Sequence, residues 1–112
     1  MVYDAIRKDN LTISSYTEGQ CTLVNTTAYK CNGLAVISTR CTINNVLSPS
    51  ATGRQILTVL GAVAPAGSHM IIAMYDGKPL MCWLSGQSII LRNDTELPSN
   101  AVVYITGTYP CT

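Results

Sequence analysis

The side chains that could take part in acid–base or nucleophilic chemistry are few and widely spaced in this sequence. His69 is the single histidine, and Ser68 beside it does not lie in the Gly-x-Ser-x-Gly pattern of a catalytic serine elbow. The carboxylates are Asp4, Asp9, Glu18, Asp76, Asp94 and Glu96. Asp94 and Glu96 have the residue types of a glycosidase pair, but no apolar stretch beside them would keep one carboxyl protonated. We therefore predict that the protein has no catalytic residues and is not an enzyme.

The cysteines occur at positions 21, 31, 41, 82 and 111. No Cys-x2-Cys pair is present, which predicts no metal site, and no motif suggests a cofactor. In an oxidising compartment, five cysteines would form two disulfides and leave one thiol. However, Cys41 and Cys82 alternate in phase with aliphatic neighbours, as buried free thiols do. We expect mainly free thiols, with the disulfide alternative left open.

Aromatic residues are the better candidates for function. The chain has six tyrosines and one tryptophan, residues that join a large apolar body to a polar tip and suit binding surfaces. Next to charged or amide side chains in turns, such residues could stack on and hydrogen-bond a sugar. Trp83 suits a core anchor or a subunit interface better than a ligand platform. The candidate ligand contacts are Tyr75, Asp76, Lys78, Asn93, Asp94 and, ranked lower, Trp83.

A β-hairpin is the clearest element that would position these residues. Asp76-Gly77 separates two apolar runs, 70–75 and 78–84, and this dipeptide favours a two-residue turn with positive φ. The register then pairs Tyr75 with Lys78. Met70, Ile72, Met81 and Trp83 share one face, and Ile71, Ala73, Leu80 and Cys82 share the other. Both faces are apolar, so the hairpin lies inside a sandwich, or one face packs on the core and the other on a second subunit.

The remainder of the chain has an all-β pattern of Thr-, Ile- and Val-rich runs broken by turn residues. The expected strands are 11–16, 20–24, 34–43, 55–63, 70–75, 79–84, 87–92 and 101–108. About eight short strands predict a small antiparallel β-sandwich, jelly-roll-like, over residues 10–112. Residues 1–9 are expected to form an N-terminal arm or the remnant of a stalk.

Charged residues make up only 12% of the chain, and the net charge is +1. The lysines and arginines are scattered, which argues against nucleic-acid binding, and no apolar run is long enough for membrane insertion. A surface with so few charges is uncharged and polar, or is partly covered by other copies of the chain. We expect a homo-oligomer.

The C-terminal third carries a resemblance to a known class of proteins. Its order is Asp76-Gly-Lys-Pro-Leu80, Trp83, Ser85-Gly86, Ile89-Ile-Leu91, Leu97-Pro98 and Val102–Pro110. This resembles the C-terminal knob of a bacteriophage tail fibre or similar virion fibre. The resemblance implies a homotrimer on the virion, or at the extracellular or cell surface. Its loops or grooves would bind a host-surface glycan or protein.

Two alternatives of other classes remain open. One is a small secreted or periplasmic inhibitor or effector stapled by disulfides. Ala28-Tyr-Lys-Cys31 and Tyr75–Leu80 are faintly similar to c-type lysozyme inhibitors of bacterial envelopes. The other is the globular tip of a pilin-type adhesin, with Cys82 and Cys111 closing a C-terminal loop.

Overall fold

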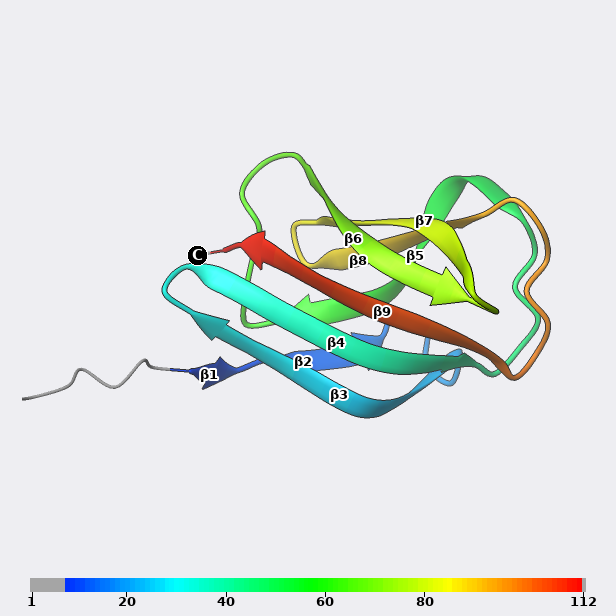
Figure 1. Cartoon of the computed structure of the whole chain (residues 1–112), viewed down its shortest axis with the longest axis horizontal. Helices are drawn as coiled ribbons and strands as arrows, with labels where there is room; N and C mark the ends of the chain where they lie inside the picture. The colour runs from blue at the N-terminus through cyan, green and yellow to red at the C-terminus, as the bar shows by residue number, and fades with distance from the viewer. Residues whose placement is uncertain (1–7, 112) are drawn as a thin grey trace, which may run out of the picture.

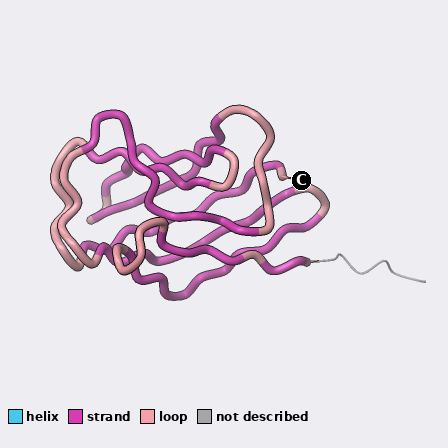
Figure 2. Tube along the Cα trace, turned by 180° about the vertical axis from the view of Figure 1, so that it is seen from behind, coloured by secondary structure: helices cyan, strands magenta, loops and turns pink. Residues whose placement is uncertain are grey.

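A computed structural model describes residues 8–111, which consist of strands joined by turns and loops (Figures 1 and 2). The strands are β1 (Asp9–Asn10), β2 (Thr12–Ser15), β3 (Cys21–Cys31), β4 (Leu34–Ile43), β5 (Ser50–Leu60), β6 (Ser68–Tyr75), β7 (Lys78–Ser85), β8 (Ser88–Asn93) and β9 (Ala101–Pro110). No helix that could cross a membrane occurs within this described range. The predicted all-β class is confirmed.

All nine strands belong to one antiparallel sheet with the order β1-β3-β4-β9-β6-β7-β8-β5-β2. Strands β1 and β2 lie at opposite edges of this sheet, although only Leu11 separates them in the sequence. The segment 9–15 therefore crosses from one edge to the other and almost closes the sheet into a barrel. Figures 1 and 2 show the strands wrapping around a common interior. One continuous sheet is present where the sequence suggested the two sheets of a sandwich.

Backbone hydrogen bonds hold the crossing segment in place. The Leu11 N–H donates to the Ala28 carbonyl of β3 at 2.9 Å, and the Tyr16 N–H donates to the Ile56 carbonyl of β5 at 2.9 Å. Contacts on both sides satisfy edge groups that would otherwise be free to pair with another chain. This closure lets a chain of modest length surround one core.

The core is built by strict alternation along the long central strands. In β4 and β9 every second side chain points inward, as the period of two of a strand requires. The largest fully buried side chains are Tyr109, Ile37, Ile43, Leu57, Leu84, Ile89, Leu91, Leu97 and Ile105. The opposite side chains of β4 and β9 face outward, so this sheet has a filled interior and a solvent-exposed outer face.

The predicted hairpin is confirmed in turn type and register. Asp76 has φ 50° and Gly77 has φ 73°, and Tyr75 pairs with Lys78. On the inner side, Ile71, Ala73 and Cys82 are buried. One face of the hairpin therefore packs on the chain's own core and the other is exposed, which excludes the interior of a sandwich.

Strand boundaries differ from expectation in the first third of the chain. Strand β3 continues to Cys31, whereas the sequence predicted a strand that ended at residue 24. A bulge between Val24 and Thr27, with Asn25 at φ 52°, absorbs the break in pattern and lets pairing resume. Strand β1 begins at Asp9, inside the expected arm, and residues 1–7 lie outside the described range.

Candidate functional site

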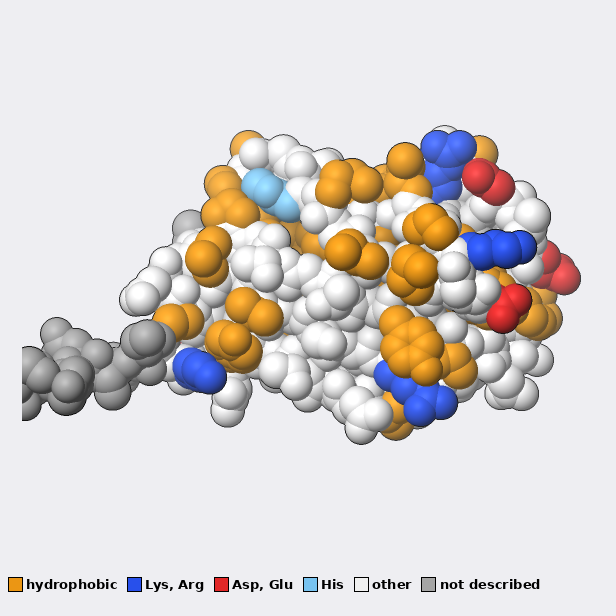
Figure 3. Space-filling model, viewed as in Figure 1, with side chains coloured by type: hydrophobic (Ala, Val, Ile, Leu, Met, Phe, Trp, Pro, Cys, Tyr) orange, Lys and Arg blue, Asp and Glu red, His pale blue; other side chains and the backbone are white. Residues whose placement is uncertain are grey.

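The outer face of the sheet carries two transverse rows of side chains that cross several strands. One row runs Arg40, Tyr104, Met74 and Pro79, and the other runs Ser38, Thr106, Ile72, Met81 and Arg92. We call the surface made by these two rows the outer face. Figure 3 shows it as hydrophobic side chains among uncharged polar ones, with charged side chains toward the end where the hairpin tip lies.

The middle of this outer face and its border are apolar and exposed. Ile72 and Met81, directly opposite each other, have 58% and 50% of their surface accessible, and Met70 has 65%. We call Met70, Ile72 and Met81 the apolar strip. Adjacent exposed hydrophobic side chains of this kind mark interaction surfaces more often than isolated ones do. Methionine in particular adapts its shape to a partner.

At one end of the outer face lies a hollow of about 340 Å³, which we call the hairpin-tip cleft. Its lining is Lys78, Pro79, Leu80, Met81, Arg92, Asp94 and Thr95. The Arg92 Nε donates to Asp94 Oδ1 at 3.2 Å, and this ion pair is solvent-exposed. The cleft thus combines an apolar floor from β7 with charged groups of both signs. It brings together two of the predicted contacts, Lys78 and Asp94.

Three other predicted contacts lie elsewhere around this region. Asp76 is exposed in the turn, where its positive φ serves the hairpin. Tyr75 is half-buried and packs against the core. Trp83 is half-buried on the outer side of β7, and its ring covers Gly53 so closely that a Cβ there would lie 2.5 Å from it. Trp83 therefore packs over β5 rather than lining the cleft.

The sixth predicted contact, Asn93, is buried with 1% of its surface accessible. Its amide Nδ2 donates to the carbonyls of Leu47 and Ser48, at 3.3 and 3.0 Å, and to that of Thr95 at 3.0 Å. These bonds tie the end of β8 to the loop that precedes β5. In this structure Asn93 positions the loop that carries Asp94 and is not accessible to a ligand.

All five cysteines are free thiols, and two of them, Cys41 and Cys82, are fully buried as the alternation predicted. The Cys41 thiol is hydrogen-bonded to that of Cys21, which lowers the pKa of Cys21 and raises that of Cys41. Burial raises the pKa of Cys82 to about 12. Within residues 8–111, no three His, Cys, Asp or Glu side chains are grouped so that they could hold a metal ion.

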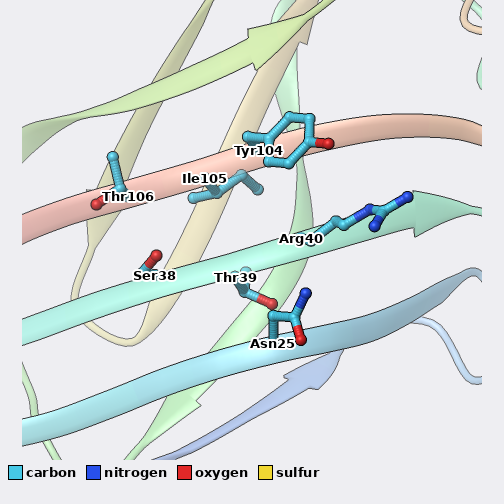
Figure 4. A pocket seen from close by; sticks show the side chains of 7 residues that line it. All are labelled: Asn25, Ser38, Thr39, Arg40, Tyr104, Ile105 and Thr106. Carbon is cyan, nitrogen blue, oxygen red and sulfur yellow. The ribbon is translucent and has the colours of Figure 1, made fainter.

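A second hollow, of about 510 Å³, lies beside the β3 bulge, where β3, β4 and β9 form the side of the outer face opposite to β7 and β8 (Figure 4). We call it the bulge hollow. Its lining is Asn25, Ser38, Thr39, Arg40, Tyr104, Ile105 and Thr106. The Arg40 guanidinium carbon lies 5.9 Å from the centre of the Tyr104 ring, and 55% of Tyr104 is accessible. An exposed aromatic ring, a cation, an amide and hydroxyl groups thus surround one hollow.

Sequence reasoning did not select any residue of the bulge hollow. Arg40 and Tyr104 fall inside predicted strands, and only the pairing of β4 with β9 places them opposite each other. The available signal was Asn25-Thr26-Thr27, a polar interruption after an apolar run, which is consistent with a bulge. That signal gives the bulge but not the residues across the sheet.

Comparisons of the chain with protein-family models, with curated proteins and with solved structures find no match.

Proposed function

We propose that this chain is a non-enzymatic receptor-binding or adhesion module that recognises a host-surface glycan or protein. In this proposal it forms the tip of a virion fibre, such as a phage tail fibre, and acts at the virion or cell surface. The observation that carries the binding role is the hairpin-tip cleft. There the two-residue hairpin presents Lys78, strand β8 presents Arg92 and the loop after β8 presents Asp94, around an apolar floor.

The cleft combines an apolar surface with charged groups, which is suited to binding a ligand. A ligand can bury apolar surface on Pro79 and Leu80 while its polar groups reach Lys78 and Asp94 at the rim. Such combinations of an apolar centre and a polar border are typical of binding sites. The scaffold beneath is a nearly closed antiparallel sheet, so the backbone that carries these groups is held in place before a ligand arrives.

The apolar strip supports the oligomeric part of the proposal. Met70, Ile72 and Met81 expose at least half of their surface in the isolated chain. Contact with other copies would remove this surface from water, at about 25 cal/mol for each Å² buried. We propose a homotrimer in which the strip packs on a neighbouring copy and leaves the hairpin tips at the distal end.

The alternatives of a disulfide-stapled inhibitor or a pilin-type tip depend on bridges that the structure does not contain, because all five thiols are free. In the Cys82–Cys111 closure, both residues would have to be bridged, whereas Cys82 is a free buried thiol and Cys111 a free half-buried one. No other observation favours these two alternatives.

Binding of labelled protein to whole cells tests the proposed function. A panel of bacterial cells, with erythrocytes as an unrelated surface, should reveal saturable binding to a subset of the cells. Removing surface glycans by periodate, or surface proteins by protease, then identifies the receptor class. Absence of saturable binding to every cell type, at protein concentrations up to about 100 µM, would overturn the proposal, because even weak single-site recognition falls in that range.

A further inference from the structure

The bulge hollow exists because the pairing of β3 with β4 is interrupted. Between Val24 and Thr27 the register shifts, and Asn25 takes a positive φ that asparagine tolerates better than most residues. The Thr26 and Thr39 hydroxyls are hydrogen-bonded to each other at 2.9 Å, which joins the two strands beneath the hollow. Figure 4 shows the Asn25 side chain pointing from β3 toward Thr39. The shape of the hollow is therefore fixed by the bulge and by the hydrogen bond between β3 and β4.

Several polar groups around the hollow are already engaged, and others are available to a ligand. The Thr106 hydroxyl donates its hydrogen to the Ile37 carbonyl at 3.3 Å. The Asn25 amide and the Ser38 hydroxyl are exposed and have no hydrogen-bond partner among residues 8–111. They offer two amide hydrogens, a hydroxyl hydrogen and acceptor oxygens, which suits the adjacent hydroxyl groups of a sugar.

The charge at the hollow comes from one arginine. No carboxylate among the described residues lies within 4 Å of the Arg40 guanidinium, whereas Arg92 at the opposite end of the outer face is paired with Asp94. A guanidinium binds a carboxylate through two parallel hydrogen bonds. A single unpaired arginine matches one negative charge, so it favours a monocarboxylate over a phosphate dianion.

The aromatic ring beside this arginine indicates that the ligand also has a flat or ring-shaped apolar face. More than half of Tyr104 is accessible, and in Figure 4 its ring lies over β9 next to the Arg40 side chain. An exposed tyrosine ring accepts the apolar face of a flat or ring-shaped ligand and keeps its hydroxyl for a hydrogen bond. A pyranose ring has such a face, and the volume of the hollow is within the range of small-molecule sites.

From this combination we infer that the bulge hollow binds an acidic sugar, with the pyranose ring on Tyr104, its carboxylate on Arg40 and its hydroxyls on Asn25 and Ser38. Uronic acids and sialic acids share this chemistry. The site is separate from the hairpin-tip cleft, since Met74 and Ile72 lie between the two hollows in the transverse rows.

Titration with soluble sugars tests the inference without cells. The probes are methyl glucuronide, N-acetylneuraminic acid and the neutral methyl glucoside, followed by saturation-transfer and chemical-shift NMR. We expect at least one acidic probe to bind with a Kd of about 1 mM, typical of a single sugar residue, and about tenfold more tightly than the glucoside. Binding by one acid alone identifies the sugar class.

Matched variants show whether the acidic probe binds in the bulge hollow or in the hairpin-tip cleft. Arg40→Gln removes the charge but keeps a hydrogen-bond donor, and it should weaken binding of the acidic probe about tenfold, the loss of a charge-assisted hydrogen bond. Tyr104→Ala should weaken the binding of the acidic probe by a similar factor. Arg92→Gln removes the cation of the hairpin-tip cleft and should leave this binding unchanged. The inference is overturned if neither acid binds, if the glucoside binds equally well, or if only Arg92→Gln matters. Because the probes are soluble, this result is independent of whether the hairpin-tip cleft binds cells.

Discussion

Gly107 is placed where β9 has no room for a side chain. A Cβ at this position would lie 2.7 Å from the Cβ of Ile71 and closer still to its Cγ2. Ile71 is held in the core by the confirmed hairpin register, so it has little freedom to yield. This contact lets β6 and β9 approach each other on the inner side of the sheet.

Replacing this glycine should therefore destabilise the fold. Gly107→Ala is expected to cost about 1 to 3 kcal/mol, the usual range for overpacking a filled core, and to lower the melting temperature by several degrees. Thr108→Ala, at an exposed position of the same strand, is the control. Equal melting temperatures for the two variants in a thermal scan would show that the Ile71 contact is not tight.

Two buried acidic groups predict a loss of stability in alkali. Burial raises the pKa of Cys82 to about 12 from 9.0, and that of Tyr109 to about 12 from 10.0. In the unfolded chain both groups lose their protons at lower pH than in the native state. The native state therefore binds more protons above pH 9, and the free energy of unfolding falls as pH rises, at up to about 1.4 kcal/mol per pH unit for each group.

Urea unfolding at pH 8 to 10.5 measures this slope. Cys82→Ala should make the decline shallower above pH 9, although the variant starts from a lower stability. A free energy of unfolding that is flat or rises across this interval would contradict the burial of both groups.

At the scale of elements, the loop after β8 depends on one side chain. Asn93 supplies hydrogen bonds to three backbone carbonyls, and the backbones of Leu47 and Leu97 close the same region with a pair of 2.9 Å bonds. The loop presents Asp94 to the hairpin-tip cleft, so the shape of the cleft relies on a residue that does not line it.

Asn93→Ala should remove these three hydrogen bonds. The Leu47 carbonyl keeps the Leu97 N–H as a donor and the Ser48 carbonyl keeps the Arg54 guanidinium, so the tie between β8 and the loop before β5 is weakened. We expect a loss of about 1 to 3 kcal/mol in the free energy of unfolding, because each intramolecular hydrogen bond contributes about 1 kcal/mol. Asn45→Ala, at an exposed position, should change stability by less than about 0.5 kcal/mol. Chemical denaturation distinguishes the two, and an equally small effect at Asn93 would refute the positioning role.

The elements that sequence reasoning obtained correctly are those fixed by local chemistry. Asp76-Gly77 determines its own turn, and the turn determines which hairpin residues face the core. The effects of the bulge at Asn25 on strand pairing and on the surface could not be predicted, because they are not local. The bulge keeps β3 paired with β4 as far as Cys31, and it opens a hollow whose other wall comes from β9.

For the whole molecule, the decisive feature absent from the sequence pattern is the closure of the sheet. Alternation tells which side chains face inward, but it gives the same pattern for a sandwich and a barrel-like sheet. The difference depends on Leu11 and its neighbours crossing between edges, which only the pairing of β1 with β3 and β2 with β5 reveals. Asn93 also looked like a surface residue, but the structure buries it because its amide bonds the distant carbonyls of Leu47 and Ser48.

The apolar strip predicts the state of assembly. Light scattering at micromolar concentration should give three times the 12.0 kDa chain mass. Ile72→Asp should shift the mass toward one chain and leave the circular dichroism spectrum unchanged, because a buried charge at an interface is costly. Val46→Asp, at another exposed apolar position, is the control. A monomeric mass for the unmodified protein would refute the trimer.

The central claim is that the hairpin-tip cleft recognises a receptor. Its most direct test is the binding of Lys78→Ala/Asp94→Ala protein to cells that bind the unmodified protein, with Glu18→Ala as an exposed control outside the cleft. We predict at least about a tenfold loss of affinity for the double variant, the loss expected for two charged contacts, at unchanged melting temperature and oligomeric mass. Binding of the double variant equal to that of the unmodified protein would contradict the claim.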